Sequence, residues 1–212
     1  MKGVSIWGCL SLVGVLVLSN ARTAIAADVA LLTVAKGIYY QQTGADAPAA
    51  LTNNGYILDV TVDLTARGTA RSAAVKPPGG TNESLALDVD QFELKQKYNT
   101  QAKLDQHYPD GNYTISLNTV HDGNRSIGLL LQSAAYPNAP HISNLSAARG
   151  INANGYFLLT WDPMAAGKDE DFIQLRIEDS SGSKIFETPD FGKAGTLTGK
   201  AVNALIPRKA QS

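Results

Sequence analysis

The chain contains almost no cysteine. Cys9 is the only one among 212 residues, and it lies inside an N-terminal apolar segment that we expect to be removed. A mature chain without cysteine can form no disulfide, no cysteine nucleophile and no thiolate metal site. The fold should therefore depend on its hydrophobic core.

Histidine is also scarce, and its spacing does not indicate catalysis. His107, His121 and His141 include no pair at the H-x-x-x-H spacing of metal sites, and the sequence has no G-x-S-x-G pentapeptide to present a serine nucleophile. We expect all three histidines near turns at strand ends, in contact with solvent. We therefore predict no catalytic, cofactor-binding or metal-binding residue, and a protein that is not an enzyme.

Neither sign of charge dominates. The chain has 18 basic and 19 acidic residues, and removal of residues 1–26 takes away Lys2 and Arg22, which leaves 16 basic residues and a net charge near −3. No cluster of Lys and Arg occurs. Nucleic acid and anionic membrane surfaces are therefore poor candidates as partners.

The N-terminus has the pattern of a secretory signal. Lys2 precedes an apolar run that extends through Leu18, and small residues follow, ending in Ala24-Ile25-Ala26 as an A-x-A cleavage site. The apolar part is too short for a convincing membrane span, although an uncleaved anchor helix is the alternative. We expect a secreted or extracytoplasmic mature chain of about 186 residues, enough for one large or two ordinary domains.

Alternating apolar and polar residues predict an all-β fold. Tyr113, Ile115 and Leu117 should face one side of a strand that follows the turn at residues 109–111, and residues 56–64 alternate in the same way. Such strands form antiparallel sheets with one buried face. No stretch shows a sustained helical period with caps at both ends, so little helix is expected. The predicted architecture is two tandem antiparallel β-sandwiches.

The predicted domains are a signal peptide at 1–26, a β-sandwich at 28–135, a linker at 136–140 that contains two prolines, and a second domain at 141–212. In the first domain a polar crossover is expected at residues 99–106, and an Asp122-Gly123 hairpin turn should precede the last strand. The expected strands of the first domain cover residues 30–40, 56–64, 67–75, 85–98, 113–120 and 127–131, and the strand within 67–75 is expected to be a short partner of the strand at 56–64. The expected strands of the second domain cover residues 142–148, 156–161, 172–178, 184–188 and 202–206.

The second half resembles the front of a fibronectin type III domain. The likeness consists of Ala139-Pro140 before the first strand, the segment GYFLLTWDP at 155–163, and DFIQLRI at 171–177. It implies that Trp161 lies in the core between two sheets. The first half is similar to the same immunoglobulin-like superfamily through Pro109 and Tyr113, whose spacing resembles a tyrosine corner.

The resemblance also implies that the second domain is incomplete. A fibronectin type III domain has seven strands, and the second domain has five. One missing strand is central, so that Ile173, Leu175 and Ile177 would lack a partner layer. Either the reading frame is truncated or frameshifted, or another chain supplies a strand. Truncation is favoured here, because strand borrowing needs a matched groove that the sequence does not reveal.

Several other groups could carry chemistry but have simpler explanations. Asp162 and residues 169–171 could hold calcium, yet a solvated acidic loop is favoured. Asp88 and Asp90 should lie on one side of a strand as outward polar residues. Tyr39-Tyr40 should place one ring in the core and one outside, where it could stack on a sugar. Four N-x-S/T triplets, at Asn82, Asn112, Asn124 and Asn144, would accept glycans only in a cell with that machinery.

The expected function follows from the fold class and from the lack of catalytic patterns. We expect a secreted or cell-surface binding, adhesion or spacer protein, with a protein or polysaccharide partner and no cofactor. The alternatives are a carbohydrate-binding or accessory module derived from a larger extracellular hydrolase, and a free-standing enzyme. The fold alone does not decide among them.

Overall fold

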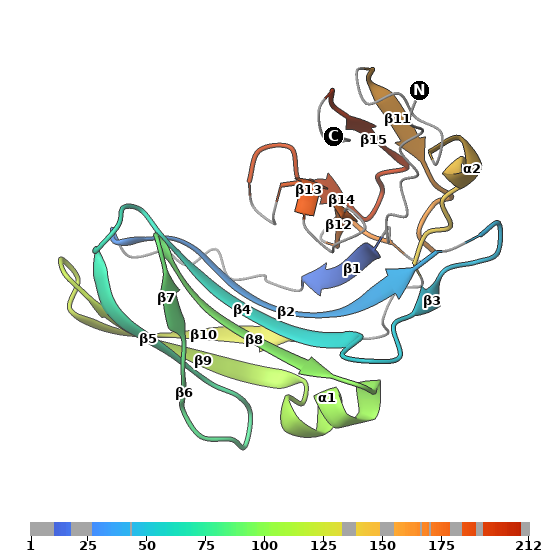
Figure 1. Ribbon diagram of the computed structural model, residues 1–212. Coiled ribbons are helices and arrows are strands. Elements are labelled where there is room, and N and C mark those ends of the chain that lie inside the picture. The colour runs from blue at the N-terminus through green and yellow to red at the C-terminus, as the bar shows by residue number, and fades with distance from the viewer. Residues whose placement is uncertain are drawn as a thin grey trace. The chain divides into compact units, whose positions relative to one another are not determined.

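A computed structural model describes residues 11–17, 27–42, 44–132, 139–148, 155–165, 167–169, 171–178, 184–189 and 193–208, with the side chains of 11–17, Glu178 and Ile185 left out. These residues are mostly in antiparallel strands (Figure 1), which confirms the all-β class. Helix is limited there to α1 (Gln101–His107) and α2 (Leu145–Ala148). The predicted cleavage site, most of the linker, Glu170 and the turn at 179–182 lie outside the described residues.

The chain divides into two compact units. One consists of Leu16–Gly37 and Thr52–Tyr136, and we call it the Tyr113 unit. The other consists of Met1–Val15, Ile38–Leu51 and Pro137–Ser212, and we call it the Trp161 unit.

The Tyr113 unit contains two groups of paired strands. In one the order is β2 (Val29–Gln41, as far as Gly37), β4 (Tyr56–Leu64), β8 (Gln91–Tyr98) and β7 (Ala86–Asp88). In the other it is β10 (Asn124–Leu131), β9 (Gly111–Thr119), β5 (Ala70–Lys76) and β6 (Glu83–Ser84).

Both groups of strands contribute to one hydrophobic core. Leu58, Val60 and Val62 of β4 are fully buried, as the alternation predicted, and so are Tyr113 and Ile115 of β9. Polar residues between them stay nearer the surface, because successive side chains of a strand point to opposite faces. The two strands expected from this alternation are confirmed.

Two expectations for this unit were wrong. The short strand expected as a partner of β4 is β5, which pairs with β9 and β6 instead. The second concerns His107, which was expected at the end of a strand. The predicted crossover at 99–106 does connect β8 of one group to β9 of the other, but it contains α1, whose N-cap Thr100 accepts a hydrogen bond from the Lys103 N–H at 3.3 Å. Only Leu104 is buried from this helix, so no helical period could be seen in the sequence, and His107 ends a helix instead of a strand.

Tyr113 has the environment of a tyrosine corner. Its ring is fully buried, and its hydroxyl donates a hydrogen bond to the Pro109 carbonyl oxygen at 3.0 Å. Burial raises the pKa of Tyr113, and the charges of Asp110 and Asp105 act in the same direction. The predicted interior position of this ring is confirmed.

Removing the hydroxyl of Tyr113 should weaken this corner without opening a cavity. We expect Tyr113→Phe to lower the free energy of unfolding by about 1 kcal/mol, the usual contribution of one hydrogen bond. Urea denaturation followed by circular dichroism measures the change. Tyr156→Phe, at a ring that is 61% exposed, is the matched control and should change nothing. Equal stability of the wild type and the Tyr113 variant would contradict the role of the hydroxyl.

The Trp161 unit has a second, separate core. β11 (Phe157–Thr160) pairs with β15 (Asn203–Ile206), and β12 (Phe172–Glu178) pairs with β13 (Lys184–Glu187), β14 (Leu197–Thr198) and β1 (Ser11–Val17). β3 (Ala49–Ala50) pairs with the end of β2 at Tyr40 and Gln41. The core residues of this unit surround Trp161, which is 3% exposed as predicted; they are Ile142, Leu145, Leu159, Met164, Ile173, Leu175, Ala204 and Ile206.

The strand expected at residues 142–148 is absent. Only Ile142 forms a bridge, to Trp161, and α2 follows. The reason is Asn144, whose Oδ1 accepts the Thr160 N–H at 3.0 Å while its Nδ2 donates to the Leu158 carbonyl at 2.8 Å. An asparagine side chain thus makes the bonds that a strand backbone would have made, which lets the chain turn.

Candidate functional site

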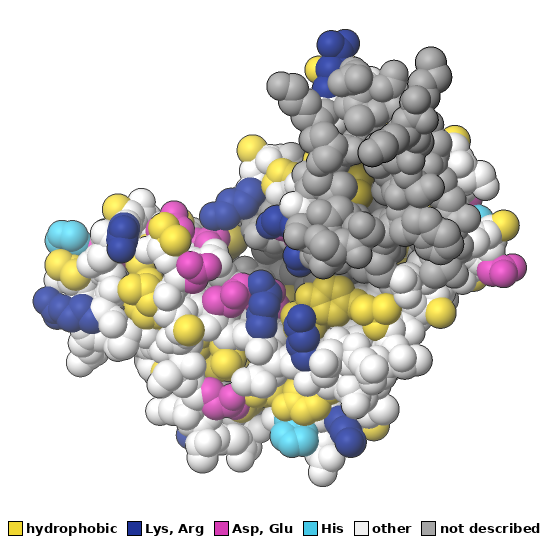
Figure 2. Space-filling model, viewed as in Figure 1, with side chains coloured by type: hydrophobic (Ala, Val, Ile, Leu, Met, Phe, Trp, Pro, Cys, Tyr) yellow, Lys and Arg dark blue, Asp and Glu magenta, His cyan; other side chains and the backbone are white. Residues whose placement is uncertain are grey.

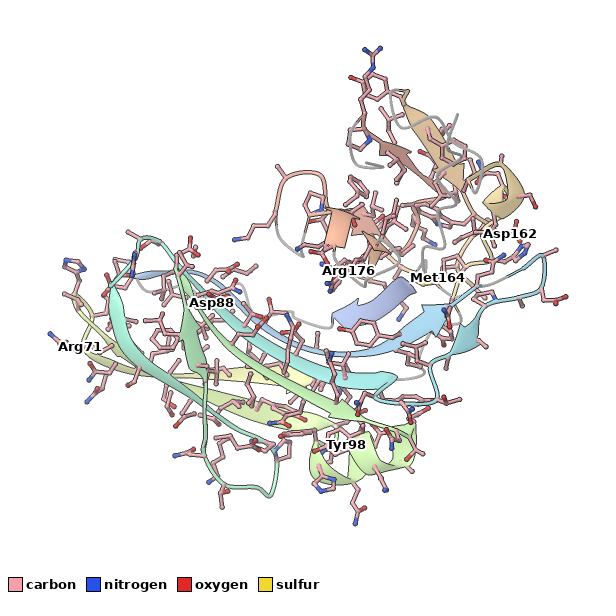
Figure 3. All side chains as sticks on the ribbon, in the orientation of Figure 1. Arg71, Asp88, Tyr98, Asp162, Met164 and Arg176 are labelled. Carbon is pink, nitrogen blue, oxygen red and sulfur yellow. The ribbon has the colours of Figure 1, made fainter. Side chains whose placement is uncertain are left out.

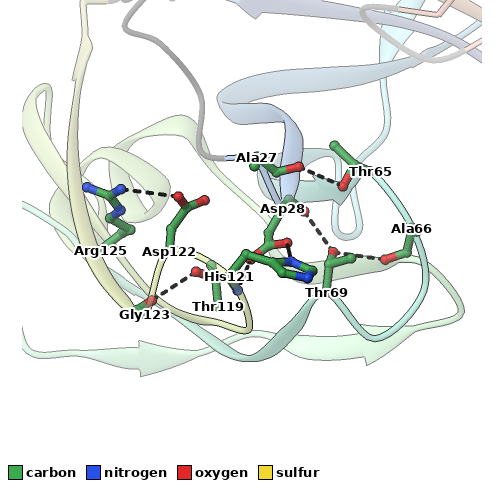
Figure 4. Close-up of polar contacts among 10 residues, drawn as sticks. All are labelled: Ala27, Asp28, Thr65, Ala66, Thr69, Thr119, His121, Asp122, Gly123 and Arg125. Carbon is green, nitrogen blue, oxygen red and sulfur yellow. Dashed lines mark hydrogen bonds and ion pairs between the residues drawn. The ribbon is translucent and has the colours of Figure 1, made fainter.

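One polar cluster of the Tyr113 unit joins Asp28 to His121 (Figure 4). Asp28 lies just before β2 and is 1% exposed, and His121 lies in the turn between β9 and β10. The His121 backbone N–H donates to Asp28 Oδ2 at 2.7 Å, and His121 Nδ1 lies 2.5 Å from Asp28 Oδ1. Both carboxylate oxygens therefore bind a residue that is 93 positions away in the chain.

The two groups shift each other's protonation. The hydrogen bond to Asp28, aided by its charge, raises the pKa of His121. Burial acts to raise the pKa of Asp28, but the hydrogen bonds and the charge of His121 outweigh it, and the pKa of Asp28 is lowered. The pair is therefore favoured as carboxylate and imidazolium.

A hydrolytic triad contains an acid and a base held in this way, together with a nucleophilic hydroxyl that is hydrogen-bonded to the base. The neighbouring hydroxyls make other bonds (Figure 4). Thr65 donates to the Ala27 carbonyl at 3.0 Å, Thr69 to the Asp28 carbonyl at 2.8 Å, and Thr119 to the Gly123 carbonyl at 2.9 Å. The cluster as built holds the start of β2 against a hairpin turn.

The Asp28–His121 pair predicts a pH-dependent stability. Because the folded pKa of His121 is raised, its contribution is complete below the ordinary value of 6.5 and disappears as pH rises through the folded pKa. Because the folded pKa of Asp28 is lowered, its contribution is complete above 3.8 and disappears at more acidic pH. His121→Gln should therefore destabilise the protein more at pH 5 than at pH 9, as measured by urea denaturation. His107→Gln, at a ring whose Nδ1 faces the Lys103 carbonyl, is the control, and an equal loss at both pH values in His121→Gln would contradict the prediction.

His141 forms a similar clamp in the Trp161 unit. Its Nδ1 lies 3.0 Å from Asp162 Oδ2, and its Nε2 lies 2.8 Å from the Ala45 carbonyl oxygen. The hydrogen bond to Asp162 raises the pKa of His141, and the contact with Ala45 adds to this effect. The two ring nitrogens of His141 therefore contact residues that are 21 and 96 positions away in the chain.

The carboxylates of the acidic loop that the structure describes, at Asp162, Asp169 and Asp171, do not form a metal-binding group. Asp162 is directed to His141, Asp169 is exposed, and Asp171 is 2% exposed with its Oδ2 accepting the Lys168 N–H at 2.8 Å. Within the described ranges, no group of three or more His, Cys, Asp and Glu side chains could hold a metal ion.

The remaining sequence candidates lie apart from one another. His107 packs on Tyr98, with ring centroids 5.1 Å apart, and Tyr98 is labelled beside α1 in Figure 3. Asp88 and Asp90 are both exposed, but the expectation that they share one side of a strand was wrong, because Asp88 ends β7 and Asp90 lies in the turn before β8. The expectation for Tyr39-Tyr40 was wrong, since both rings are half-buried. Residues 39 and 40 lie near the end of β2, where neither face is fully covered or fully open.

Sequence reasoning missed Lys36. It lies in the middle of β2 and is 1% exposed, and its Nζ lies 2.8 Å from Asp105 Oδ1 and 3.1 Å from Asp110 Oδ1. The only sequence signal is a lysine within the apolar run of residues 29–40, which shows burial but not the partners. This ammonium joins β2 to α1 and to the turn before β9.

The surface carries mixed charge. Figure 2 shows basic and acidic side chains interspersed over the visible face. In the part of the chain that the structure describes, no helix is long and apolar enough to cross a membrane.

Comparison with known proteins gives no relative. No family model matches the chain, and no curated protein or solved structure is significantly similar to it.

Proposed function

We propose that the protein is a secreted or cell-surface binding, adhesion or spacer protein without enzymatic activity. In this proposal the two units are tandem β-sandwiches of the immunoglobulin-like superfamily, and the second resembles a fibronectin type III domain. Residues 1–26 are its signal peptide, and the mature chain begins at Ala27.

The observation behind this proposal is that the His121 and His141 side chains both make structural contacts. Each histidine faces a carboxylate and connects distant segments, and the threonine hydroxyls around Asp28 donate to backbone carbonyls. These histidine and threonine side chains therefore stabilise loops. The fold assignment is supported by the hydroxyl of Tyr113 on the Pro109 carbonyl and by the burial of Trp161 against a second layer of strands.

The test compares the wild type with His121→Gln and His141→Gln on a panel of ester, peptide and glycoside substrates. We expect no turnover above the buffer rate for any of the three proteins, together with lower thermal stability of both variants. Turnover by the wild type that either variant loses while it remains folded would overturn the proposal. Mass spectrometry of the protein exported from a secreting host should give an N-terminus at Ala27.

A carbohydrate-binding module is the alternative, and one observation favours it. Tyr156 is 61% exposed near the exposed Leu158, and the Arg208 guanidinium lies over its ring, 5.0 Å from the centroid, so this unit presents an aromatic ring at the surface. Retention on a panel of insoluble polysaccharides tests this alternative. Tyr156→Ala should abolish retention, whereas Leu87→Ala, at a side chain that is 55% exposed in the other unit, should not. No retention of the wild type on any glycan would contradict it.

A further inference from the structure

Residues 11–15 lie along β12 in the Trp161 unit (Figure 1). The two strands are antiparallel, with Ser11 opposite Arg176, Val13 opposite Gln174 and Val15 opposite Phe172. Residues 11–15 belong to the apolar part of the predicted signal peptide. They are thus paired with β12, the strand that would lack a central neighbour if this domain followed the fibronectin type III pattern.

The hydrogen bonds of β12 show which backbone groups face β1. The Leu175 N–H donates to Thr188 Oγ1 at 2.9 Å, and the Leu175 carbonyl accepts the Thr188 N–H at 2.9 Å, so both groups point toward the β13 side. Successive residues of an antiparallel strand direct these groups to opposite edges. The N–H and C=O of Gln174 therefore face β1, where Val13 lies opposite.

This edge belongs to a strand that covers the core. Ile173 and Leu175 are fully buried in the cluster around Trp161, so β12 cannot leave the sheet without exposing that core. An edge of such a strand presents a row of N–H and C=O groups that binds a further strand readily. β12 therefore has the backbone edge that strand addition requires, and residues 11–15 are paired along it.

We propose that this edge of β12 is a strand-binding site. Residues 11–15 occupy it in the uncleaved chain, and an extended apolar segment of another polypeptide occupies it, antiparallel to β12, once residues 1–26 have been removed. The inference names the partner class of the proposed binding function and rests on the proposed export, because cleavage vacates the edge. The chain's own occupant shows the chemistry: the uncharged sequence SLVGV, paired through its backbone.

The experiment uses the full chain with a protease site inserted between Ala26 and Ala27, cut only after the protein has folded. A fluorescent peptide of residues 11–17 is then titrated, and its binding is measured by anisotropy. The cut chain should bind the peptide at least about ten-fold more tightly than the uncut chain, because exchange no longer competes with a tethered strand. Once the peptide has replaced the cut segment of residues 1–26, Trp7 leaves with that segment, and the remaining tryptophan emission reports Trp161 alone.

Two methylated peptides test the predicted geometry. N-methylation at Val13 removes the N–H that faces Gln174 and should weaken binding about ten-fold, since a backbone hydrogen bond is lost and a methyl group enters the ladder. N-methylation at Val17, beyond the last residue paired with β12, is the matched control and should leave binding near that of the parent peptide.

Each other outcome has a defined meaning. A cut chain that keeps Trp161 buried yet does not take up the peptide overturns the proposal, and so does equal binding of the two methylated peptides. A cut chain that dimerises, with a dimer that the peptide cannot dissociate, identifies a second copy as the occupant and overturns it too. If the cut chain unfolds, refolding on addition of the peptide supports the proposal, and failure to refold overturns it. None of these results depends on export or on the substrate panel, so the proposed function can fail independently.

Discussion

Replacing both Asp105 and Asp110 with asparagine should destabilise the protein strongly. Lys36 is 1% exposed, and these two carboxylates lie within 3.1 Å of its ammonium group. A buried charge left without a counter-charge costs about 3–5 kcal/mol, and we expect a loss near 3 kcal/mol because the asparagine oxygens can still accept hydrogen bonds. Urea denaturation of the double variant measures this loss.

The single variants and a change at Lys36 itself separate the charge effect from packing. Asp105→Asn or Asp110→Asn alone leaves one carboxylate in place and should cost about 1 kcal/mol or less. Lys36→Met removes the buried charge but keeps a side chain of similar volume, so its stability should stay within about 1 kcal/mol of the wild type. A double variant that costs no more than the sum of the single ones would show that the ammonium does not need these partners.

Replacing Trp161 with alanine should give the largest loss in the Trp161 unit. The indole is 3% exposed among Ile142, Leu159 and Ile173, and truncation of such a buried aromatic side chain costs about 3–5 kcal/mol. Circular dichroism during urea denaturation follows the transition without relying on the tryptophan that has been removed.

Two controls define the origin of this loss. Trp161→Phe keeps an aromatic ring in the core but lacks the indole N–H that donates to the Ala201 carbonyl at 2.7 Å, so it should fall between the wild type and the alanine variant. Tyr156→Ala, at an exposed ring, should change the stability by no more than about 0.5 kcal/mol. A Trp161→Ala variant as stable as Tyr156→Ala would mean that the indole does not support the core.

The strands could be predicted where alternate residues are buried. Leu58, Val60 and Val62 repeat every second residue, and so do Tyr113 and Ile115, because a pleated strand with one covered face requires that spacing. The boundaries of β12 match the predicted residues 172–178 for the same reason. Pairing with distant partners could not be predicted in this way.

The features that were missed depend on contacts that are remote in sequence. Nothing near Lys36 indicates that its partners are 69 and 74 residues away, or that Asp28 binds His121. β5 could pair with either β4 or β9, and the alternation of its own residues is compatible with both partners, so the sequence does not show that it pairs with β9. The strand predicted at residues 142–148 does not form because the side-chain amide of Asn144 makes the hydrogen bonds to β11 that a strand backbone would make.

The bonds of Asn144 also bear on the choice of a host cell for producing the protein. Asn144-Leu145-Ser146 is an acceptor triplet for an oligosaccharyltransferase, yet the amide of Asn144 is already used by the backbone of β11. A sugar attached there during translocation would remove a donor hydrogen from Nδ2 and place a bulky polar group at this turn. In a eukaryotic secretory pathway, maturation of the Trp161 unit would compete with modification of this one side chain, whereas bacterial production avoids that competition.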